Sequence, residues 1–161
     1  MFPYLEKSIK QLINAGTDFI VIPCNTLHAL LPKLRRKFNI RFIDLIEETS
    51  KMIKNKYQKV GILASKRTRH ERLYDRKLSD IEFIYPFEDE QERLSRTILR
   101  IISGKHDQED KKFLDELIKN LQKRGAEKIV LACTDLGNII KDNNLVIDST
   151  KVLIERIKDN Y

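Results

Sequence analysis

Several residue types and patterns are scarce in this sequence of 161 residues, and each scarcity excludes a class of protein. Two cysteines are too few for the disulfide framework of a small secreted domain. No apolar run reaches the ~18 residues that span a bilayer. The opening residues MFPYLEKSIK lack the basic start and apolar stretch of a secretory signal. We therefore expect a cytoplasmic protein that does not bind membranes and keeps both thiols reduced.

Aromatic residues are also few, at 7%, although the net charge of +7 and the pI of about 9.4 raise the question of nucleic acid. Most Lys and Arg residues alternate with Asp and Glu, a pattern typical of solvated helix faces. Two basic clusters stand out, Lys33–Lys37 and Lys66–Arg72. Neither is accompanied by a nucleic-acid-binding motif. We expect no nucleic-acid partner, and an anionic small molecule suits a basic loop equally well.

Glycine and proline are scarce too, at five and four residues, so the division of the chain must come from its hydrophobic pattern. Short runs rich in Ile and Val alternate with longer amphipathic stretches, which predicts an α/β fold with mainly parallel sheet. Pro32 lies inside the helical stretch LHALLPKLRRKF and is expected to kink or shorten it. The expected strands are DFIVIP, IRFID, KVGILA, IEFIYP, EKIVLA and LVID.

An internal repeat contains both cysteines. GTDFIVIPC (Gly16–Cys24) matches GAEKIVLAC (Gly125–Cys133) at the glycine, the acidic third position, the Ile-Val pair and the cysteine. An amphipathic stretch precedes each copy, and each copy leads to a second short strand ending in aspartate, at Asp44 and Asp148. The repeat predicts two equivalent units related by a pseudo-twofold axis.

Each cysteine stands where a strand passes into a predicted helix, at the edge of a parallel sheet where ligands bind. The free N–H groups and partial positive charge of a helix start favour the thiolate, so each cysteine is a candidate general base or nucleophile. A free cysteine also commonly fills core volume, which is the structural alternative. We expect no metal site, because closed zinc sites need about four closely spaced ligands and the three histidines are scattered.

Two similar thiols facing one cleft suit the inversion of a carbon stereocentre, which needs a base on one face and an acid on the other. The motifs PCNT (Pro23–Thr26) and ACTD (Ala132–Asp135) resemble the two signature cysteine motifs of the aspartate/glutamate racemase family. The segments GTDFIVIPCNTLHAL, IEETSKMI, PFEDEQ and KRGAEKIVLACTD are most similar to its aspartate racemase branch. The resemblance covers nearly the whole chain.

This resemblance implies two pseudo-symmetric lobes with mainly parallel sheets and an active site in the cleft between them. We expect a first lobe at residues 1–44 plus 144–161, lacking its initial strands, and a second lobe at residues 45–143. The family implies a homodimeric racemase of an acidic amino acid, most simply aspartate, that needs no cofactor. Its two bases correspond to Cys24 and Cys133. The implied substrate-binding residues are Asn25, Thr26, Ser65, Thr68, Thr134 and Asp135.

The sequence departs from the family pattern at three places. Members of the family open with a G-G-M-G-P turn and a further strand, which MFPYLEK does not supply. Their T-x-G-T loop corresponds to Ser65–Thr68, where Arg67 replaces glycine, and a family lysine corresponds to Ser103. Lys66, Arg67 and Arg69 are candidates to replace the lost cations. Two alternatives follow: a truncated, inactive member, or a relative acting on another acidic substrate as a decarboxylase or isomerase.

Overall fold

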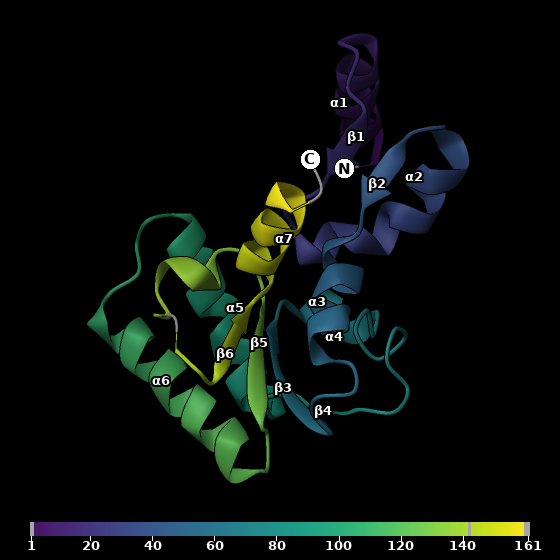
Figure 1. The fold of residues 1–161 in the computed structure, drawn as a ribbon. Coiled ribbons are helices and arrows are strands. Elements are labelled where there is room, and N and C mark those ends of the chain that lie inside the picture. The colour runs from purple at the N-terminus through teal and green to yellow at the C-terminus, as the bar shows by residue number, and fades with distance from the viewer. Residues whose placement is uncertain (1, 142, 160–161) are drawn as a thin grey trace.

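A computed structural model describes residues 2–141 and 143–159, which form a small first lobe and a larger second lobe (Figure 1). In the first lobe, strands β1 and β2 pair in parallel, with Phe19 opposite Arg41. The first-lobe elements are α1 (Phe2–Asn14), β1 (Phe19–Val21), the 3-10 helix η1 (Asn25–Leu30), α2 (Leu31–Lys37) and β2 (Arg41–Ile43).

The core of the first lobe is small. Its buried side chains come from α1, both strands and α2, and they are Ile9, Ile20, Ile22, Leu31, Leu34 and Phe42. Pro32 has the predicted effect, because the expected single helix is divided into η1 and α2, with the proline in the first turn of α2. A proline is tolerated there because the first N–H groups of a helix have no partner within it.

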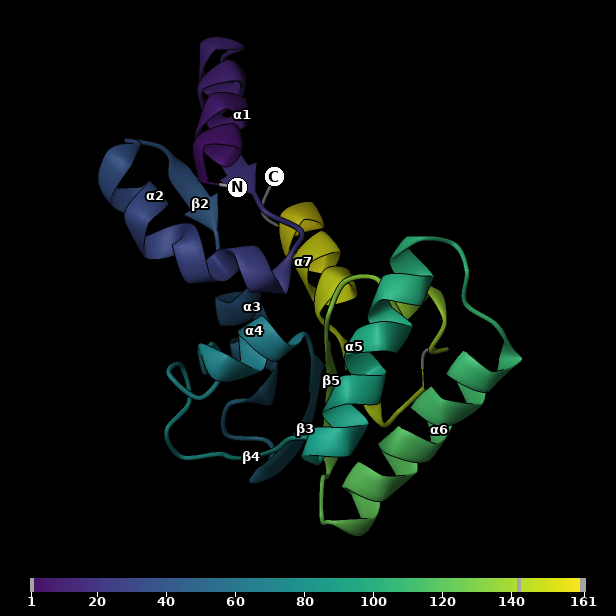
Figure 2. The same ribbon diagram turned by 180° about the vertical axis from the view of Figure 1, so that it is seen from behind.

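The second lobe contains a four-stranded parallel sheet in the order β4-β3-β5-β6. Helices cover both of its faces, and α5 and α6 lie on the side nearer the viewer in Figure 2. Within the described residues, no helix is long and apolar enough to cross a membrane. The second-lobe elements are α3 (Leu45–Ile53), β3 (Lys59–Ala64), α4 (Lys66–His70), β4 (Glu82–Ile84), α5 (Glu88–Ile102), α6 (Gln108–Lys123), β5 (Lys128–Ala132), the 3-10 helix η2 (Leu136–Asn138), β6 (Val146–Asp148) and α7 (Ser149–Lys158).

The central strands explain the continuous apolar runs of the sequence. On β5, Ile129 and Leu131 pack against α5 and α6, whereas Val130 and Ala132 face the opposite cluster, which includes residues of α3 and α7. A parallel strand buried on both faces needs apolar residues at every position, so its sequence does not alternate. The predicted α/β fold with mainly parallel sheet is confirmed.

Residues 144–161 were expected in the first lobe, but the structure places their strand in the other sheet. The strand within residues 144–161, β6, pairs with β5 and therefore belongs to the sheet of the second lobe. Helix α7 packs against α3, β5 and β6, so it also lies with the second lobe. The LVID pattern predicts a strand but contains no information about which sheet the strand joins, because that depends on contacts far along the chain.

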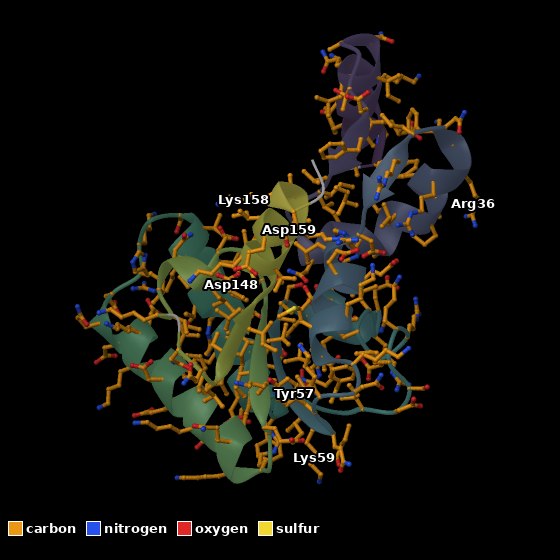
Figure 3. The ribbon with its side chains drawn as sticks, viewed as in Figure 1. Arg36, Tyr57, Lys59, Asp148, Lys158 and Asp159 are labelled. Carbon is orange, nitrogen blue, oxygen red and sulfur yellow. The ribbon has the colours of Figure 1, made fainter. Side chains whose placement is uncertain are left out.

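The two halves of the repeat have the same local structure at their second strands. Asp44 caps α3 by accepting hydrogen bonds from the N–H groups of Ile46 and Glu47, and Asp148 caps α7 by accepting from Thr150 N–H. Figure 3 labels Asp148 at the base of α7. Gly137 of η2 lies so close that a Cβ there would stand 2.2 Å from an Asp148 carboxylate oxygen. Glycine is therefore required at this approach.

Candidate active site

The two cysteines come from different sheets but share one cavity. Cys24 begins η1 in an extended conformation after β1, and Cys133 follows β5 directly. Both are half-buried free thiols. They line a cavity of about 370 Å³ between the lobes. Five of the six predicted substrate-binding residues also line it, namely Asn25, Thr26, Ser65, Thr134 and Asp135.

The Cys133 thiol is held in its protonated form. Burial raises its pKa to about 11, and the negative charges of Asp135 and Cys24 act in the same direction. The backbone N–H groups of Asp135 and Leu136 lower the pKa but do not outweigh burial. The prediction that a helix start favours the thiolate is therefore wrong for Cys133. The expected helix is only the three-residue η2, whose dipole is correspondingly small.

Three hydroxyl groups form a closed triangle across the lobes. The Thr26 hydroxyl lies 2.8 Å from that of Ser65 and 3.2 Å from that of Thr68, and the last two are 3.1 Å apart. Thr68 is buried behind the other two, and its N–H donates to the Ser65 oxygen. Thr26 and Ser65 therefore reach the cavity as hydroxyl groups of fixed orientation, and Thr68 supports them.

The Asn25 side chain is already engaged inside the protein. Its Oδ1 accepts a 2.7 Å hydrogen bond from the Tyr74 hydroxyl, and its Nδ2 donates to Ser149 Oγ at 3.1 Å. Neither Asn25 nor Thr26 caps η1, because the cap residue is Cys24 and no side-chain cap bond is present. Asparagine and threonine before a helical stretch are common caps, and the sequence predicts that role for both residues, but the structure shows it for neither. Their side chains fix the Cys24 loop against the second lobe instead.

The basic loop after β3 has three candidate cations, and two of them line the cavity. Ser65 caps the short helix α4, which directs Lys66 and Arg67 to the cavity. Lys66 pairs with Glu92, whereas Arg67 is exposed and has no ionic partner in the described part of the chain. Arg69 instead lies over the Tyr85 ring, 5.7 Å from its centre, and 3.5 Å from Glu88. Arg67 is thus the cation most available to a ligand.

Sequence reasoning missed one wall of the cavity. Helix α5 contributes Ser95, Ile98, Leu99 and Ile102 to the lining, and Leu99 and Ile102 are 66% and 59% exposed. The run ILRII at the end of α5 puts apolar residues on more than one face of the helix, and this excess was the signal available in the sequence. Ser103, at the position of the family lysine, ends α5 with its hydroxyl donating to Arg100 O and is not among the lining residues.

Within the described residues, no three His, Cys, Asp or Glu side chains are grouped to hold an ion. The cavity brings together two thiols, a hydroxyl cluster, a carboxylate at Asp135 and cations at Lys66 and Arg67. The Asp135 carboxylate lies 3.9 Å from Cys133 Sγ, at the limit of a weak hydrogen bond from the thiol. This arrangement offers two proton-transfer groups beside donors for an anionic ligand.

Comparisons with known proteins identify the relatives of this chain. RacX, a broad specificity amino-acid racemase of Bacillus subtilis (strain 168), is 26% identical over 156 residues, covering 94% of this chain and 68% of that protein. The structure of a Picrophilus torridus aspartate racemase superposes with a TM-score of 0.81 at 23% identity, covering 98% of this chain and 68% of that one. A Bacillus anthracis glutamate racemase superposes with a TM-score of 0.71 at 14% identity, covering 98% of this chain and 62% of that one.

A family model gives the assignment. The model described as Asp/Glu/Hydantoin racemase matches residues 2–157, which is nearly the whole chain. The two cysteine motifs that resemble this family lie at the same cavity. The chain therefore belongs to the Asp/Glu/Hydantoin racemase family and is a racemase of the Asp/Glu type.

Proposed function

We propose that this protein racemises an acidic amino acid, with aspartate as the first candidate, by a two-base mechanism that uses Cys24 and Cys133. The observation that carries the proposal is the shared cavity, which both thiols reach from strands of different sheets. Inversion requires proton removal on one face of the α-carbon and proton delivery on the other. Two thiols brought by two separate units can satisfy this requirement without a cofactor.

The protonation of Cys133 sets the starting state. With its pKa raised to about 11 by burial, Cys133 begins as the thiol and Cys24 acts as the base. The Cys24 thiolate removes the α-proton, and Cys133 delivers its proton to the opposite face. The products are the opposite enantiomer, a Cys24 thiol and a Cys133 thiolate. The high pKa makes this second thiolate a strong base, which suits the reverse reaction.

The remaining cavity residues supply binding groups for a zwitterion. Thr134 offers a hydroxyl group to a carboxylate, and Arg67 offers a positive charge. Thr26 and Ser65 can each donate to the carboxylate by turning a hydroxyl out of the triangle. The Asp135 carboxylate offers an acceptor to the α-ammonium group. Because the Asn25 amide is hydrogen-bonded to Tyr74 and Ser149, we assign Asn25 and Thr68 to positioning of the loops rather than to direct binding.

We also propose that the protein functions as a homodimer in the cytoplasm. Helix α1 supports an interface, because Tyr4, Leu12 and Ile13 are exposed on it at 79%, 44% and 36%. Sedimentation of the wild type beside a variant with Tyr4→Ser and Leu12→Ser tests this. A species of twice the chain mass that the double substitution dissociates supports the dimer, and a wild-type monomer contradicts it.

Exchange of the α-proton in deuterium oxide, followed by NMR, tests the proposed reaction. Both enantiomers of aspartate and of glutamate are incubated with the wild type, Cys24→Ser, Cys133→Ser and the exposed control Ser103→Ala. We expect exchange with inversion in the wild type and control, and inversion slower by about 10²-fold or more in either cysteine variant.

Other results separate the alternatives. Absence of exchange with either amino acid, in a chain shown by circular dichroism to be folded, identifies an inactive member of the family. Loss of carboxylate as carbon dioxide, or cis–trans conversion of an unsaturated dicarboxylate, identifies another reaction at the same site. Racemisation at more than about a tenth of the wild-type rate after removal of one cysteine rejects the two-base mechanism.

A further inference from the structure

A buried histidine connects the Cys24 loop to the second lobe. The His28 side chain belongs to η1 and is 5% exposed. Its Nδ1 lies 2.9 Å from the carbonyl oxygen of Cys24, and its Nε2 lies 3.1 Å from the backbone nitrogen of Leu45. One imidazole ring therefore joins the backbone of one cysteine to the first residue of α3.

The two contacts define the protonation of the ring. The Leu45 N–H is a donor, so Nε2 accepts and carries no proton. Nδ1 then carries the proton and donates it to the Cys24 carbonyl. Burial lowers the pKa of His28, and nearby Arg35 and Lys77 lower it further. The hydrogen bond to the Cys24 carbonyl and the charge of Asp44, whose carboxylate lies 3.7 Å from Nε2, oppose this shift without reversing it. The ring is neutral at pH 7, in the tautomer that the bridge requires.

We propose that His28 is a positioning residue for Cys24: its ring fixes the carbonyl of Cys24, and with it the direction of the thiol, against the start of α3. This inference rests on the proposed racemase function only for its effect on turnover. The bridge itself is a property of the folded chain and is measurable without any substrate.

His28 is the side chain that contacts the Cys24 backbone itself, whereas Asn25 and Thr26 hold the residues that follow it. The Cys24 N–H donates to Ile22 O, only two residues earlier, and no side chain caps η1. The strand before Cys133 is different, because it lies inside the four-stranded sheet. The chain provides a side-chain bridge at the cysteine whose own strand is short.

Two conservative substitutions separate the two halves of the bridge. His28→Asn places an amide near the position of Nδ1 and can keep the bond to Cys24, but it loses the acceptor for Leu45. His28→Gln places its amide near the position of Nε2 and can keep the bond to Leu45, but it loses the donor to Cys24. The two variants are similar in polarity, so a difference between them reports which contact matters.

The first readout is alkylation of each cysteine by iodoacetamide at pH 8, followed by mass spectrometry of the Cys24 and Cys133 peptides. We expect His28→Gln to alkylate at Cys24 about fivefold faster than the wild type, the factor expected for one ordinary hydrogen bond. Loss of the bridge lets the half-buried thiol reach solvent. His28→Asn should stay within about twofold of the wild type, and the Cys133 rate should not change in either variant.

The second readout is turnover of aspartate. We expect His28→Gln to lower kcat by about fivefold with little change in KM, because the binding groups of the cavity are untouched, and His28→Asn to restore most of kcat. Equal Cys24 alkylation in folded wild type and His28→Gln overturns the proposal. So does a parallel rise at both cysteines, which indicates general loosening. If no variant racemises but Cys24 alkylation separates the two, the positioning role stands and the proposed function fails.

Discussion

The two cysteine loops have matching sequences but different supports. Cys24 follows a strand of three residues in a two-stranded sheet, whereas Cys133 follows a strand of five residues with neighbours on both sides. The Cys133 loop is held by its own backbone and by the surrounding core. The Cys24 loop is held by side chains that bond to the other lobe. A repeated motif thus determines where a thiol lies, and the long-range contacts determine what keeps it there.

The largest expected effect is the loss of racemisation when either cysteine is replaced. It tests whether both thiols take part in proton transfer although their loops are supported differently. Cys24→Ser and Cys133→Ser should each lower the racemisation rate by about 10²–10⁴-fold, the usual contribution of a positioned acid or base. Polarimetry of aspartate from both enantiomers measures the loss. A variant that keeps more than about a tenth of the wild-type rate removes its cysteine from the proton transfer.

The next prediction concerns the ionisation of one thiol. Because burial raises the pKa of Cys133 to about 11, this thiol stays protonated as the pH rises through neutrality. At pH 7 the thiolate fraction of Cys133 should be about 300-fold smaller than that of a small free thiol, whose pKa is about 8.5, and its alkylation correspondingly slow. The rate should increase up to about pH 11. A Cys133 profile that levels off near pH 8 contradicts this electrostatic description of the site.

A smaller effect concerns how much the side chains after each cysteine contribute to the stability of the fold. Asn25→Ala leaves the buried Tyr74 hydroxyl without its acceptor and should lower the free energy of unfolding by about 1–3 kcal/mol. Thr134→Ala, at the matching position after Cys133, should cost less than about 0.5 kcal/mol, as expected away from buried networks. Urea denaturation of both variants measures the difference. Equal losses show that the two loops are supported alike.

The smallest expected effect concerns substrate charge. Arg67→Ala should raise KM for aspartate about fivefold, the modest value expected for a pair open to solvent. Arg69→Ala is the matched control, because Arg69 lies over Tyr85 and beside Glu88 rather than at the cavity. An unchanged KM in Arg67→Ala assigns the substrate carboxylate to the hydroxyl groups alone.

Much of the fold was predictable because buried parallel strands have a simple sequence pattern. Runs such as KVGILA and EKIVLA are apolar at successive positions, and each is a strand of the second-lobe sheet. The repeat located both cysteines at the ends of strands, which is a local property. The hydroxyl loop at Ser65–Thr68 was found through its resemblance to a family pattern and lies at the cavity through Ser65.

The errors concern contacts between residues far apart in the chain. The sheet that β6 joins depends on β5 and not on the LVID pattern itself. Asn25 and Thr26 have the residue types of helix caps, but their partners Tyr74, Ser149 and Ser65 are visible only in three dimensions. The pKa of Cys133 depends on burial that a helix-start argument does not include.

The short helix η1 joins the two lobes. The side chains of Asn25, Thr26 and His28 each hydrogen-bond to the second lobe, while Cys24 and Leu27 pack against the core of the first. The Cys24 loop is therefore held from both sides, and any displacement of one lobe against the other has to break contacts of this loop. The distance between the two thiols thus depends on the packing between the lobes.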